Sequence, residues 1–354
     1  MTIWHVAPDG ALGGGAVIMA RLVRELSTDA PGAHMALIPR NADPDMAALF
    51  DGLPVQRGWY DGRANPLIFA RAIAAHARRG DVIHAHGTRA ALAGALARLI
   101  QPGLKLIYTV HGFHGLAQPG PFGARAKLER VLARVCNGVV FVSSADRDLA
   151  RAHGLKHKGL AWVIENGVDA PDIAQGAPKD IDVIFIGRLV RQKHPEAFVE
   201  TAALLPPGLT IEMIGDGELA TEIDALIAAQ TAPILRPGAL PRGDTLARLG
   251  RAKLLVMTSR WEGLPTAAIE AGMSRAAVAG YRIAPLAEIL GDQSDACLTP
   301  PDPAALANVV KGLLADDTQR ETLADALHDR CRARYAPARM AGRHRALYAA
   351  VMAG

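Results

Sequence analysis

Residues 254–271 read LLVMTSRWEGLPTAAIEA, and this stretch decides the fold class. The run from Leu254 to Thr258 is short and apolar, which is typical of a strand buried in a parallel sheet. Pro265 favours the first position of a helix, so a turn connects this strand to a helix. The backbone amides of Gly263 to Ala267 would then point out of the strand end toward an anion such as a diphosphate. A strand, an anion-binding turn and a helix in this order indicate a doubly wound α/β protein.

The same alternation of apolar runs and helical segments extends over the whole chain. Val/Ile/Leu-rich runs predict six strands in each half, near residues 3–7, 35–39, 82–85, 104–110, 139–142 and 162–164, and near 183–186, 210–214, 234–236, 254–258, 276–279 and 296–299. Helix starts are predicted at Asn65-Pro66, Thr88, Ser143 and His194-Pro195. The pattern predicts two Rossmann-like domains of parallel strands and crossover helices.

A linker separates the two sets of strands. Residues 168–180 contain Pro171, Gly176 and Pro178 and few apolar side chains. We therefore expect an N-terminal domain over residues 1–168, a C-terminal domain over 169–336, and a final helix over 337–354 that returns to the N-terminal domain. Doubly wound sheets bind ligands at the carboxyl ends of their strands, so functional residues are sought there.

Composition limits the classes of function. With 354 residues, 50% apolar and 21% charged, the chain can form two cores and is too apolar to be disordered. The net charge of +4 favours anionic partners. The basic residues are not interleaved with an aromatic platform, so nucleic acid is not an expected partner.

Cysteines and apolar stretches indicate the compartment. Cys136, Cys297 and Cys331 are few and far apart, which favours a reducing environment and neither disulfides nor a zinc site. The first six residues resemble a strand rather than a secretion signal. Arg89 and Arg98 interrupt the longest Ala/Leu stretch, so no membrane span is expected. These features predict a cytoplasmic protein.

Two glutamates flank the anion-binding turn. Glu262 precedes Gly263, and Glu270 lies five residues after Pro265, about 7 to 8 Å along the helix axis. At that spacing Glu270 can accept hydrogen bonds from a ribose while a diphosphate occupies the helix end, and Glu262 can meet sugar hydroxyls. The alternative is an ordinary helix with acidic residues near its start, where the helix dipole favours them.

These residues resemble the signature of a known enzyme family. Glu262 and Glu270, with Gly-Leu-Pro between them, are similar to the paired glutamates of the retaining glycosyltransferases of family four, which have the GT-B fold. FIGRLVRQK, residues 185–193, resembles the end of the first strand in the family's donor domain. The resemblance implies that the donor phosphates bind Gly187, Arg188, Lys193, Gly263, Leu264, Pro265 and Thr266, the ribose binds Glu270, and the sugar binds Glu262. Fixed cations would stabilise the leaving diphosphate without a metal.

Other strand ends extend the resemblance. Gly215 starts a Gly-Asp-Gly turn that matches the family, and Gly238 lies where the family contacts the nucleobase. Gly14 and Gly15 resemble the family's glycine-rich loop beside the donor phosphate and acceptor. His111 matches a His-Gly pattern whose histidine faces the transferred sugar.

His84 and His86 alternate on one predicted strand and therefore point to the same face. They could bind a metal, but no third ligand is near in sequence. We expect a packing role for them and no metal site.

A basic helix is predicted over residues 124–137. Its basic side chains are Arg125, Lys127, Arg130 and Arg134, and its apolar side chains, predicted on the opposite side, are Leu128, Val131, Leu132 and Val135. One interpretation is that this helix and the loop 115–123 contact an anionic membrane that carries a lipid-linked acceptor. A solvated arginine-rich helix is an equally weighted alternative.

The chain departs from the family pattern after Glu270. Residues 272–278 lack the usual Gly and Pro, residues 283–288 lack the Gly-Gly before an acid, and His194 stands where Gly commonly follows the Lys. A nucleotide-sugar-binding protein without transferase activity is therefore one alternative function. A NAD(P)-dependent dehydrogenase is another, because Gly215-x-Gly217-x-x-Ala220 satisfies the loose dinucleotide fingerprint, although no ribose-binding acid ends the following strand.

The resemblance implies a retaining, metal-independent glycosyltransferase without a cofactor, whose donor is a UDP- or GDP-type sugar. The expected acceptor is a saccharide or lipid-linked molecule in the assembly of a bacterial lipopolysaccharide, exopolysaccharide or glycolipid. The expected location is the cytoplasm, at the inner face of the cell membrane. The sequence does not indicate an oligomeric state.

Overall fold

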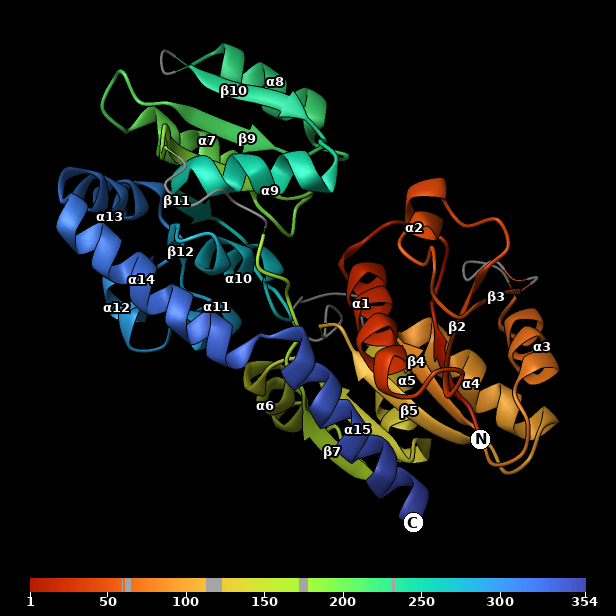
Figure 1. Cartoon of the computed structure of the whole chain (residues 1–354). Helices are drawn as coiled ribbons and strands as arrows, with labels where there is room; N and C mark the ends of the chain where they lie inside the picture. The colour runs from red at the N-terminus through yellow and green to blue at the C-terminus, as the bar shows by residue number, and fades with distance from the viewer. Residues whose placement is uncertain (59, 61–64, 113–122, 172–177, 231–232) are drawn as a thin grey trace. The chain divides into compact units, whose positions relative to one another are not determined.

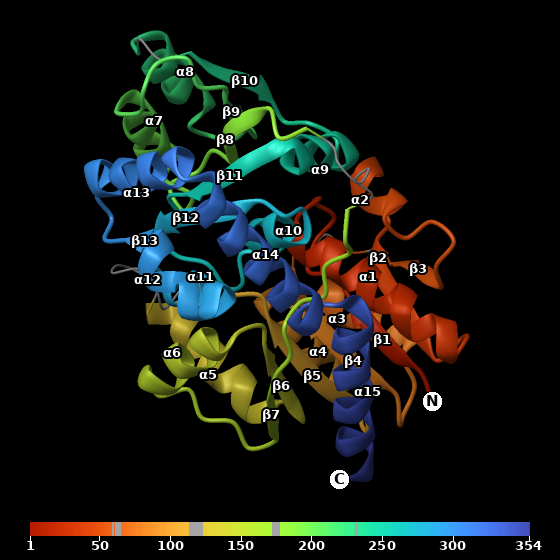
Figure 2. The same cartoon turned by 60° about the vertical axis from the view of Figure 1, so that its left-hand side comes forward.

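The computed structural model describes residues 1–58, 60, 65–112, 123–171, 178–230 and 233–354, without the side chains of 123–125 (Figure 1). The chain forms two compact units. Unit 1 comprises Met1–Gly167 and Pro337–Gly354, and unit 2 comprises Val168–Ala336. The boundary after residue 167 lies one residue before the predicted boundary after residue 168. The boundary between residues 336 and 337 is at the predicted position. Each unit is a parallel sheet with helices on both faces, as the sequence predicted (Figure 2).

Unit 1 contains a sheet of seven parallel strands in the order β3-β2-β1-β4-β5-β6-β7. The strands are β1 (Ile3–Val6), β2 (His34–Pro39), β3 (Val55–Gly58), β4 (Val82–His86), β5 (Lys105–Val110), β6 (Gly138–Phe141) and β7 (Leu160–Val163). The sequence predicted six. It missed β3, an edge strand whose Gln56 and Arg57 are exposed, because such a strand carries almost no apolar signal.

The helices of unit 1 are α1 (Gly14–Asp29), α2 (Pro44–Ala48), α3 (Pro66–His76), α4 (Thr88–Ile100), α5 (Gly123–Val135), α6 (Ser144–Ala152) and α15 (Pro337–Ala353). The predicted side-chain caps at Asn65 and Ser143 are confirmed, since they accept from the backbone amides of Leu67 and Asp146. The predicted cap at Thr88 was wrong. Gly87 occupies that position with φ 92°, a left-handed conformation that favours glycine.

Helix α15 is part of the unit 1 core. Its Leu347 and Tyr348 pack in one buried cluster with Leu22 of α1 and Ile107 of β5. The Lys105 ammonium also donates to the backbone carbonyl of Val351 at 2.8 Å. Burying a large apolar side chain contributes about 1.5 to 3 kcal/mol, so this helix stabilises the unit although it is separated from the rest of it by all of unit 2.

Unit 2 contains six parallel strands in the order β10-β9-β8-β11-β12-β13. They are β8 (Ile181–Ile186), β9 (Ile211–Ile214), β10 (Ile234–Gly238), β11 (Ala252–Met257), β12 (Ala277–Tyr281) and β13 (Leu298–Thr299). The helical elements are α7 (Pro195–Ala203), α8 (Ala220–Ala228), α9 (Arg242–Arg251), α10 (Thr266–Met273), α11 (Ala284–Leu290), the short 3-10 helix Gly291–Gln293, α12 (Ser294–Cys297), α13 (Pro303–Ala315) and α14 (Asp317–Arg334).

The strand order reverses once in each sheet. In unit 1 the reversal lies between β1 and β4, and in unit 2 it lies between β8 and β11. Loops leaving the carboxyl ends of such a strand pair diverge and leave room for a ligand. The fold therefore places the ends of β1 and β4, and of β8 and β11, at the positions where chemistry is expected.

Two backbone positions correspond to the departures from the family pattern. His194, the N-cap of α7, has φ 51°, and Arg275, just after α10, has φ 52°. These are the only non-glycine residues with positive φ in the described part of the chain. The backbone therefore keeps a left-handed shape at His194 and Arg275, although glycine is the residue that adopts it without strain.

Candidate functional site

In unit 2, four loops meet at the carboxyl ends of the central strands; we call them together the donor edge. They are residues 187–194 after β8, 215–219 after β9, 238–240 after β10 and 258–265 after β11. The backbone amide of Gly187 donates to Ile214 at 3.0 Å, and that of Gly215 donates to Gly238 at 2.9 Å. The amide of Arg260 donates to Gln192 at 2.9 Å, which ties the loop after β11 to the loop after β8.

Glycine is required where two of these loops touch. Gly215 has φ 146°, and a Cβ atom there would lie 1.9 Å from the carbonyl oxygen of Gly187. Gly187 in turn lies under the side chain of Lys193, whose Cδ would be 3.4 Å from an added Cβ. The structure therefore brings together the predicted residues Gly187, Gly215 and Gly238, while their contact with a donor stays a prediction.

An ion pair joins the two motifs that carried the resemblance. The ammonium Nζ of Lys193 lies 2.5 Å from Oε1 of Glu262. The side chains of Lys193 and Glu262 are only 17% and 8% exposed. Glu262 also accepts from the Ser259 hydroxyl at 2.8 Å and from the Gln192 amide at 3.2 Å. The carboxylate is thus fixed by three donors beside the start of α10.

Helix α10 begins one residue later than predicted. Pro265 is the N-cap, with an extended ψ of 96°, and Thr266 is the first helical residue. The prediction that Pro265 occupies the first helical position was therefore wrong by one residue. No side chain caps this helix end with a hydrogen bond. Gly263, Leu264 and Pro265 are buried in the turn, and Thr266 is partly exposed.

The second glutamate of the motif belongs to a different ion pair. Glu270 is buried, and its Oε1 accepts from Arg242 at 2.6 Å. Arg242 is the first residue of α9, and its side chain is 41% exposed. The sequence interpretation missed Arg242, because it follows the predicted nucleobase loop without any recognisable motif.

Arg188 behaves differently from Lys193. It follows Gly187 in the loop after β8 and is exposed, and its side chain forms no ion pair with any residue that the structure describes. Its guanidinium is therefore available to an anion at the donor edge. Arg188 and Lys193 leave the same strand end, as predicted, but only the lysine is fixed by a carboxylate.

In unit 1, the predicted glycine loop and His111 lie together. Helix α1 begins at Gly14, and a Cβ atom on Gly15 would lie 3.7 Å from Cδ2 of the His111 ring. His111 follows β5 and is partly exposed. His114, to which the sequence assigns only a role in shaping this loop, lies outside the described residues.

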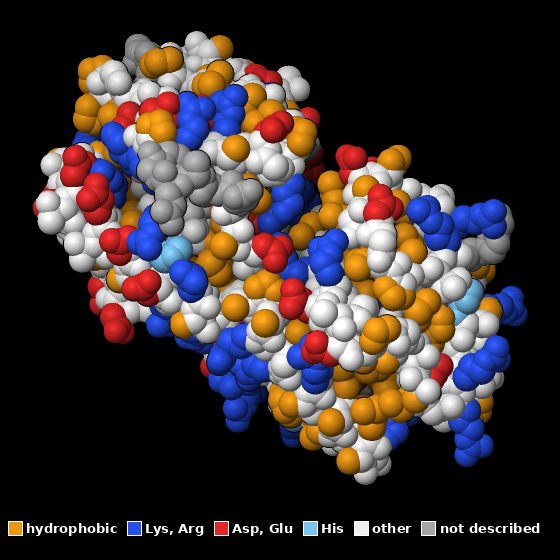
Figure 3. Space-filling model, in the orientation of Figure 1, with side chains coloured by type: hydrophobic (Ala, Val, Ile, Leu, Met, Phe, Trp, Pro, Cys, Tyr) orange, Lys and Arg blue, Asp and Glu red, His pale blue; other side chains and the backbone are white. Residues whose placement is uncertain are grey.

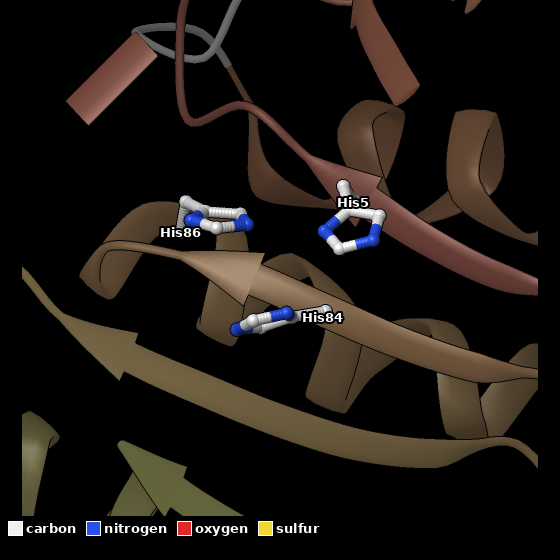
Figure 4. A group of neighbouring side chains, drawn as sticks. All are labelled: His5, His84 and His86. Carbon is white, nitrogen blue, oxygen red and sulfur yellow. The ribbon is translucent and has the colours of Figure 1, made fainter. Parts of the chain in front are cut away.

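His111 is one end of a line of imidazoles in unit 1, and its ring packs on that of His86. Figure 4 shows the three central members of this line, His5, His84 and His86. We call this line the histidine row; it consists of His34 on β2, His5 on β1, His84 and His86 on β4, and His111, with His344 of α15 packed against it. Successive rings are 5.5, 5.2, 4.4 and 5.4 Å apart between centroids. Nδ1 of His86 lies 3.2 Å from Nε2 of His111, and Nε2 of His5 lies 3.3 Å from Nδ1 of His34.

Burial keeps five of these histidines uncharged, namely His5, His34, His84, His86 and His344. Desolvation, with smaller contributions from neighbouring histidines, lowers the pKa of His5, His84 and His86 well below the usual value. Burial also lowers the pKa of His34 and of His344 to about 4. These imidazoles are therefore neutral at physiological pH.

Three histidines of the row are close enough to suggest a metal site. The ring nitrogens of His5, His84 and His86 lie within 4.8 Å of one another. The sequence supplied His84 and His86 but missed His5, which the parallel pairing of β1 with β4 brings opposite His84. However, both nitrogens of His84 already have partners, the hydroxyls of Tyr348 at 2.7 Å and Thr109 at 2.6 Å. The described geometry is that of a hydrogen-bonded network.

The predicted basic helix is α5, which ends at Val135 rather than Asn137. Leu132 is buried, whereas Val131 and Val135 are 54% and 44% exposed, so only part of the apolar side of this helix packs against the unit. Lys127 and Arg134 are exposed on the same helix. Arg125 and the loop 115–122 lie outside the described side chains.

No helix within the described residues is long and apolar enough to cross a membrane. On the face drawn in Figure 3, Lys and Arg side chains are interspersed with acidic and apolar ones over both units. This face carries no continuous basic stripe of the kind that tracks a nucleic-acid backbone.

The turn that suggested a dehydrogenase has a different role. Gly215 and Gly217 close the loop after β9 against the loop after β8, where a Cβ atom on Gly217 would lie 2.5 Å from the Leu189 carbonyl. Arg236, near the end of the next strand, pairs with Asp224 at 2.5 Å. A cation thus stands where a dinucleotide site needs a ribose-binding acid.

Two family models match the chain. "Glycosyltransferase Family 4" covers residues 12–171, and "Glycosyl transferases group 1" covers residues 171–329. The alpha-maltose-1-phosphate synthase of Mycolicibacterium smegmatis is 25% identical over 292 residues, which are 72% of this chain and 75% of the relative. An Escherichia coli UDP-Gal:alpha-D-GlcNAc-diphosphoundecaprenol alpha-1,3-galactosyltransferase is 27% identical over 214 residues, which cover 54% of this chain and 55% of that relative.

Solved structures share the whole architecture. A sucrose-phosphate synthase from Thermosynechococcus elongatus has a TM-score of 0.85 at 20% identity, covering 100% of this chain and 99% of its own. The Anabaena protein HepE in complex with UDP and glucose has a TM-score of 0.83 at 18% identity, covering 99% of both chains. At such low identity these structures show the fold alone. With both halves matched by its models, the chain belongs to the glycosyltransferases of family four and has the GT-B fold.

Proposed function

We propose that this protein transfers a sugar from a nucleotide-diphosphate sugar, of the UDP or GDP type, to an acceptor hydroxyl with retention of anomeric configuration and without a divalent metal. Unit 2 holds the donor at the donor edge. The observation that carries the proposal is the ion pair between Lys193 and Glu262, which joins the phosphate-binding and sugar-binding motifs of the family at the neighbouring ends of β8 and β11.

Lys193 can bind the leaving diphosphate while it remains paired with Glu262. An ammonium group has three N–H donors, and Glu262 takes one of them. The remaining donors can stabilise the charge that develops on the terminal phosphate as the glycosidic bond breaks. The exposed guanidinium of Arg188 supplies a second cation on the same loop. Together with the uncapped amino end of α10, these groups provide the positive field that a metal supplies in other enzymes.

Glu262 retains the capacity to bind a sugar. A carboxylate offers about four acceptor sites. Lys193 and Ser259 occupy Oε1, and Gln192 occupies one position on Oε2. One site on Oε2 is left for a sugar hydroxyl, and the three fixed donors orient it.

Glu270 would bind the ribose. Arg242 contacts only Oε1 of this carboxylate, so Oε2 can accept a ribose hydroxyl. The family pattern assigns the transferred sugar to His111 in unit 1, beside Gly15. We further propose a saccharide or lipid-linked acceptor used in assembly of a bacterial surface polysaccharide or glycolipid; the relative that acts on a diphosphoundecaprenol-linked sugar motivates the lipid-linked case.

A lipid-linked acceptor would require contact with the inner face of the cell membrane. Helix α5 exposes Val131 and Val135 beside Lys127 and Arg134, a combination suited to an anionic bilayer surface. Flotation with liposomes of anionic and of zwitterionic lipid tests this contact. Equal recovery with both kinds of liposome would remove the membrane from the proposal.

Thermal-shift measurements against UDP-, GDP-, ADP- and TDP-sugars test the donor assignment. A ligand that binds only the folded state stabilises it by an amount that grows with the logarithm of its concentration relative to its Kd, so at equal concentrations the donor that binds most tightly should give the largest shift. Release of free nucleotide diphosphate from that donor in the presence of a chelator then separates an enzyme from a protein that only binds the donor. No shift with any nucleotide sugar would overturn the proposal.

A further inference from the structure

One contact in unit 1 concerns the proposed sugar-facing histidine directly. His86, the last residue of β4, is 2% exposed, and its Nδ1 lies 3.2 Å from Nε2 of His111. The two rings are nearly parallel, at 18°. Because both atoms are ring nitrogens, one must carry the proton and the other must accept it, so this hydrogen bond couples the tautomers of the two residues.

The other nitrogen of His86 decides which of them donates. Nε2 of His86 is buried and has no hydrogen-bond partner among the described residues. If His111 donated, the proton of His86 would lie on this Nε2, as a buried and unpaired N–H group. Unpaired N–H groups are rarer in protein interiors than unpaired acceptors. The arrangement with the proton on Nδ1 of His86 leaves only a lone pair unsatisfied and is therefore favoured.

We propose that His86 is a positioning residue that donates its Nδ1–H to Nε2 of His111, fixing His111 as the neutral tautomer with its proton on Nδ1. In that tautomer His111 presents an N–H donor on the side of the ring away from His86, suited to a sugar hydroxyl. The importance of this N–H group for sugar transfer rests on the proposed function. The tautomer itself does not.

The surroundings of His86 hold it in this role. The titratable groups that act on it are His5 from β1, His84 from its own strand, His111 after β5 and His344 from α15. Desolvation is the main cause that lowers its pKa, and His111, His5 and His344 lower it further, so His86 remains a neutral donor. A metal shared by His5, His84 and His86 is the competing explanation. Both ring nitrogens of His84 already have hydroxyl partners, Tyr348 at 2.7 Å and Thr109 at 2.6 Å, which disfavours His84 as a metal ligand.

The first test measures the tautomer without any substrate. Long-range proton–nitrogen NMR spectra of the ¹⁵N-histidine-labelled protein, with His111 assigned by comparison with His111→Gln, should show Nδ1 protonated and Nε2 unprotonated. In His86→Leu the signal should move toward the Nε2-protonated form that predominates in water. A protonated Nε2 in the wild type, the same tautomer in both proteins, or loss of the wild-type pattern on removing metals with a chelator would each overturn the inference.

The second test uses the pH profile of transfer. His86→Leu removes the hydrogen bond that His86 donates to Nε2 of His111, so this nitrogen can take up a proton. We expect kcat to drop about tenfold or more, with a further loss between about pH 7 and 6 that the wild type does not show. His86→Asn keeps an amide near the Nδ1 position and should recover part of the rate. His5→Leu removes another buried histidine of the row without touching His111, and should leave the profile unchanged.

A change of stability without a change of pH profile in His86→Leu would show a merely structural role and overturn the inference. If the tautomer is as expected but the protein turns over no nucleotide sugar, the proposed function fails while the assignment of His86 stands.

Discussion

In unit 2 the groups at the sheet reversal are charged and paired, whereas in unit 1 the corresponding groups are neutral and buried. Lys193 with Glu262 and Arg242 with Glu270 connect separate elements of the donor edge through ion pairs. The histidine row connects β2, β1, β4 and the end of β5 through ring contacts, and its four buried members, His34, His5, His84 and His86, are uncharged. The same fold thus carries paired charges at the strand ends of one unit and buried neutral imidazoles in the sheet of the other.

The largest effect expected from this difference is loss of transfer when the central ion pair is broken. Lys193→Ala and Glu262→Ala should each lower kcat by about 100-fold or more, because removing one preorganised group at a developing charge costs that much. Steady-state release of nucleotide diphosphate measures it. Lys253→Ala is the matched control, since Lys253 pairs with Asp182 at 2.7 Å near the opposite ends of the same central strands. Wild-type rates in either donor-edge variant would contradict the assignment.

The second ion pair should affect binding rather than chemistry. Arg242→Ala leaves the buried Glu270 carboxylate without its partner, so we expect the donor Kd to rise by about tenfold with little change in kcat. Calorimetry with the identified donor measures the affinity. Arg248→Ala, on the same helix, breaks a comparable pair with buried Glu212 at 2.8 Å. An equal loss of affinity in both variants would show that the effect is structural.

The neutral row predicts a pH dependence of stability. The folded pKa of His34 and His344 is lowered to about 4 from the usual 6.5, so the unfolded chain binds more protons below pH 6.5. The stabilisation is complete above about pH 6.5 and is lost progressively toward pH 4, at up to about 1.4 kcal/mol per pH unit for each such group. Urea unfolding followed by Trp4 and Trp162 fluorescence at pH 7.5, 6 and 5 measures it. His34→Leu should reduce the slope, and a pH-independent midpoint would contradict a neutral row.

The smallest expected effect is on stability, at Arg275 just after the C-terminal end of α10. Two substitutions there separate the contribution of backbone strain from that of an ion pair. Arg275 holds φ 52° and pairs with Asp325 on the surface. Arg275→Gly should stabilise the protein by about 1 kcal/mol or less, because relief of a left-handed conformation outweighs a weak exposed ion pair. Thermal unfolding measures the change, and Asp325→Ala reports the ion pair alone. Destabilisation by Arg275→Gly beyond that of Asp325→Ala would show that the strain is not relieved.

The sequence predicted the layered α/β architecture because its signals are local. Apolar runs and capping residues such as Asn65 and Ser143 depend on neighbours within a few positions. The strand-end motifs were found for the same reason, since Gly187, Lys193 and Glu262 are each part of a short recognisable segment.

What the sequence could not supply were partners from distant segments. Arg242 meets Glu270 across 28 positions. His5 joins the β4 histidines only because β1 pairs with that strand in register. The edge strand β3 lacked an apolar pattern, and the exposure of Val131 on α5 depends on packing that periodicity does not determine. Each miss concerns a relation set by the tertiary structure.

The placement of α15 also sets an order of assembly during synthesis. Unit 2 is one uninterrupted stretch of chain, whereas the apolar surface of unit 1 that Leu347 and Tyr348 cover stays exposed until α15 has been synthesised. Domains generally complete themselves in the order of translation. Here unit 2 can fold before unit 1 is complete, because unit 1 still lacks α15 at that stage. A chain stalled after residue 336 would therefore contain a folded unit 2 and an exposed apolar surface on unit 1. Chaperones bind such surfaces.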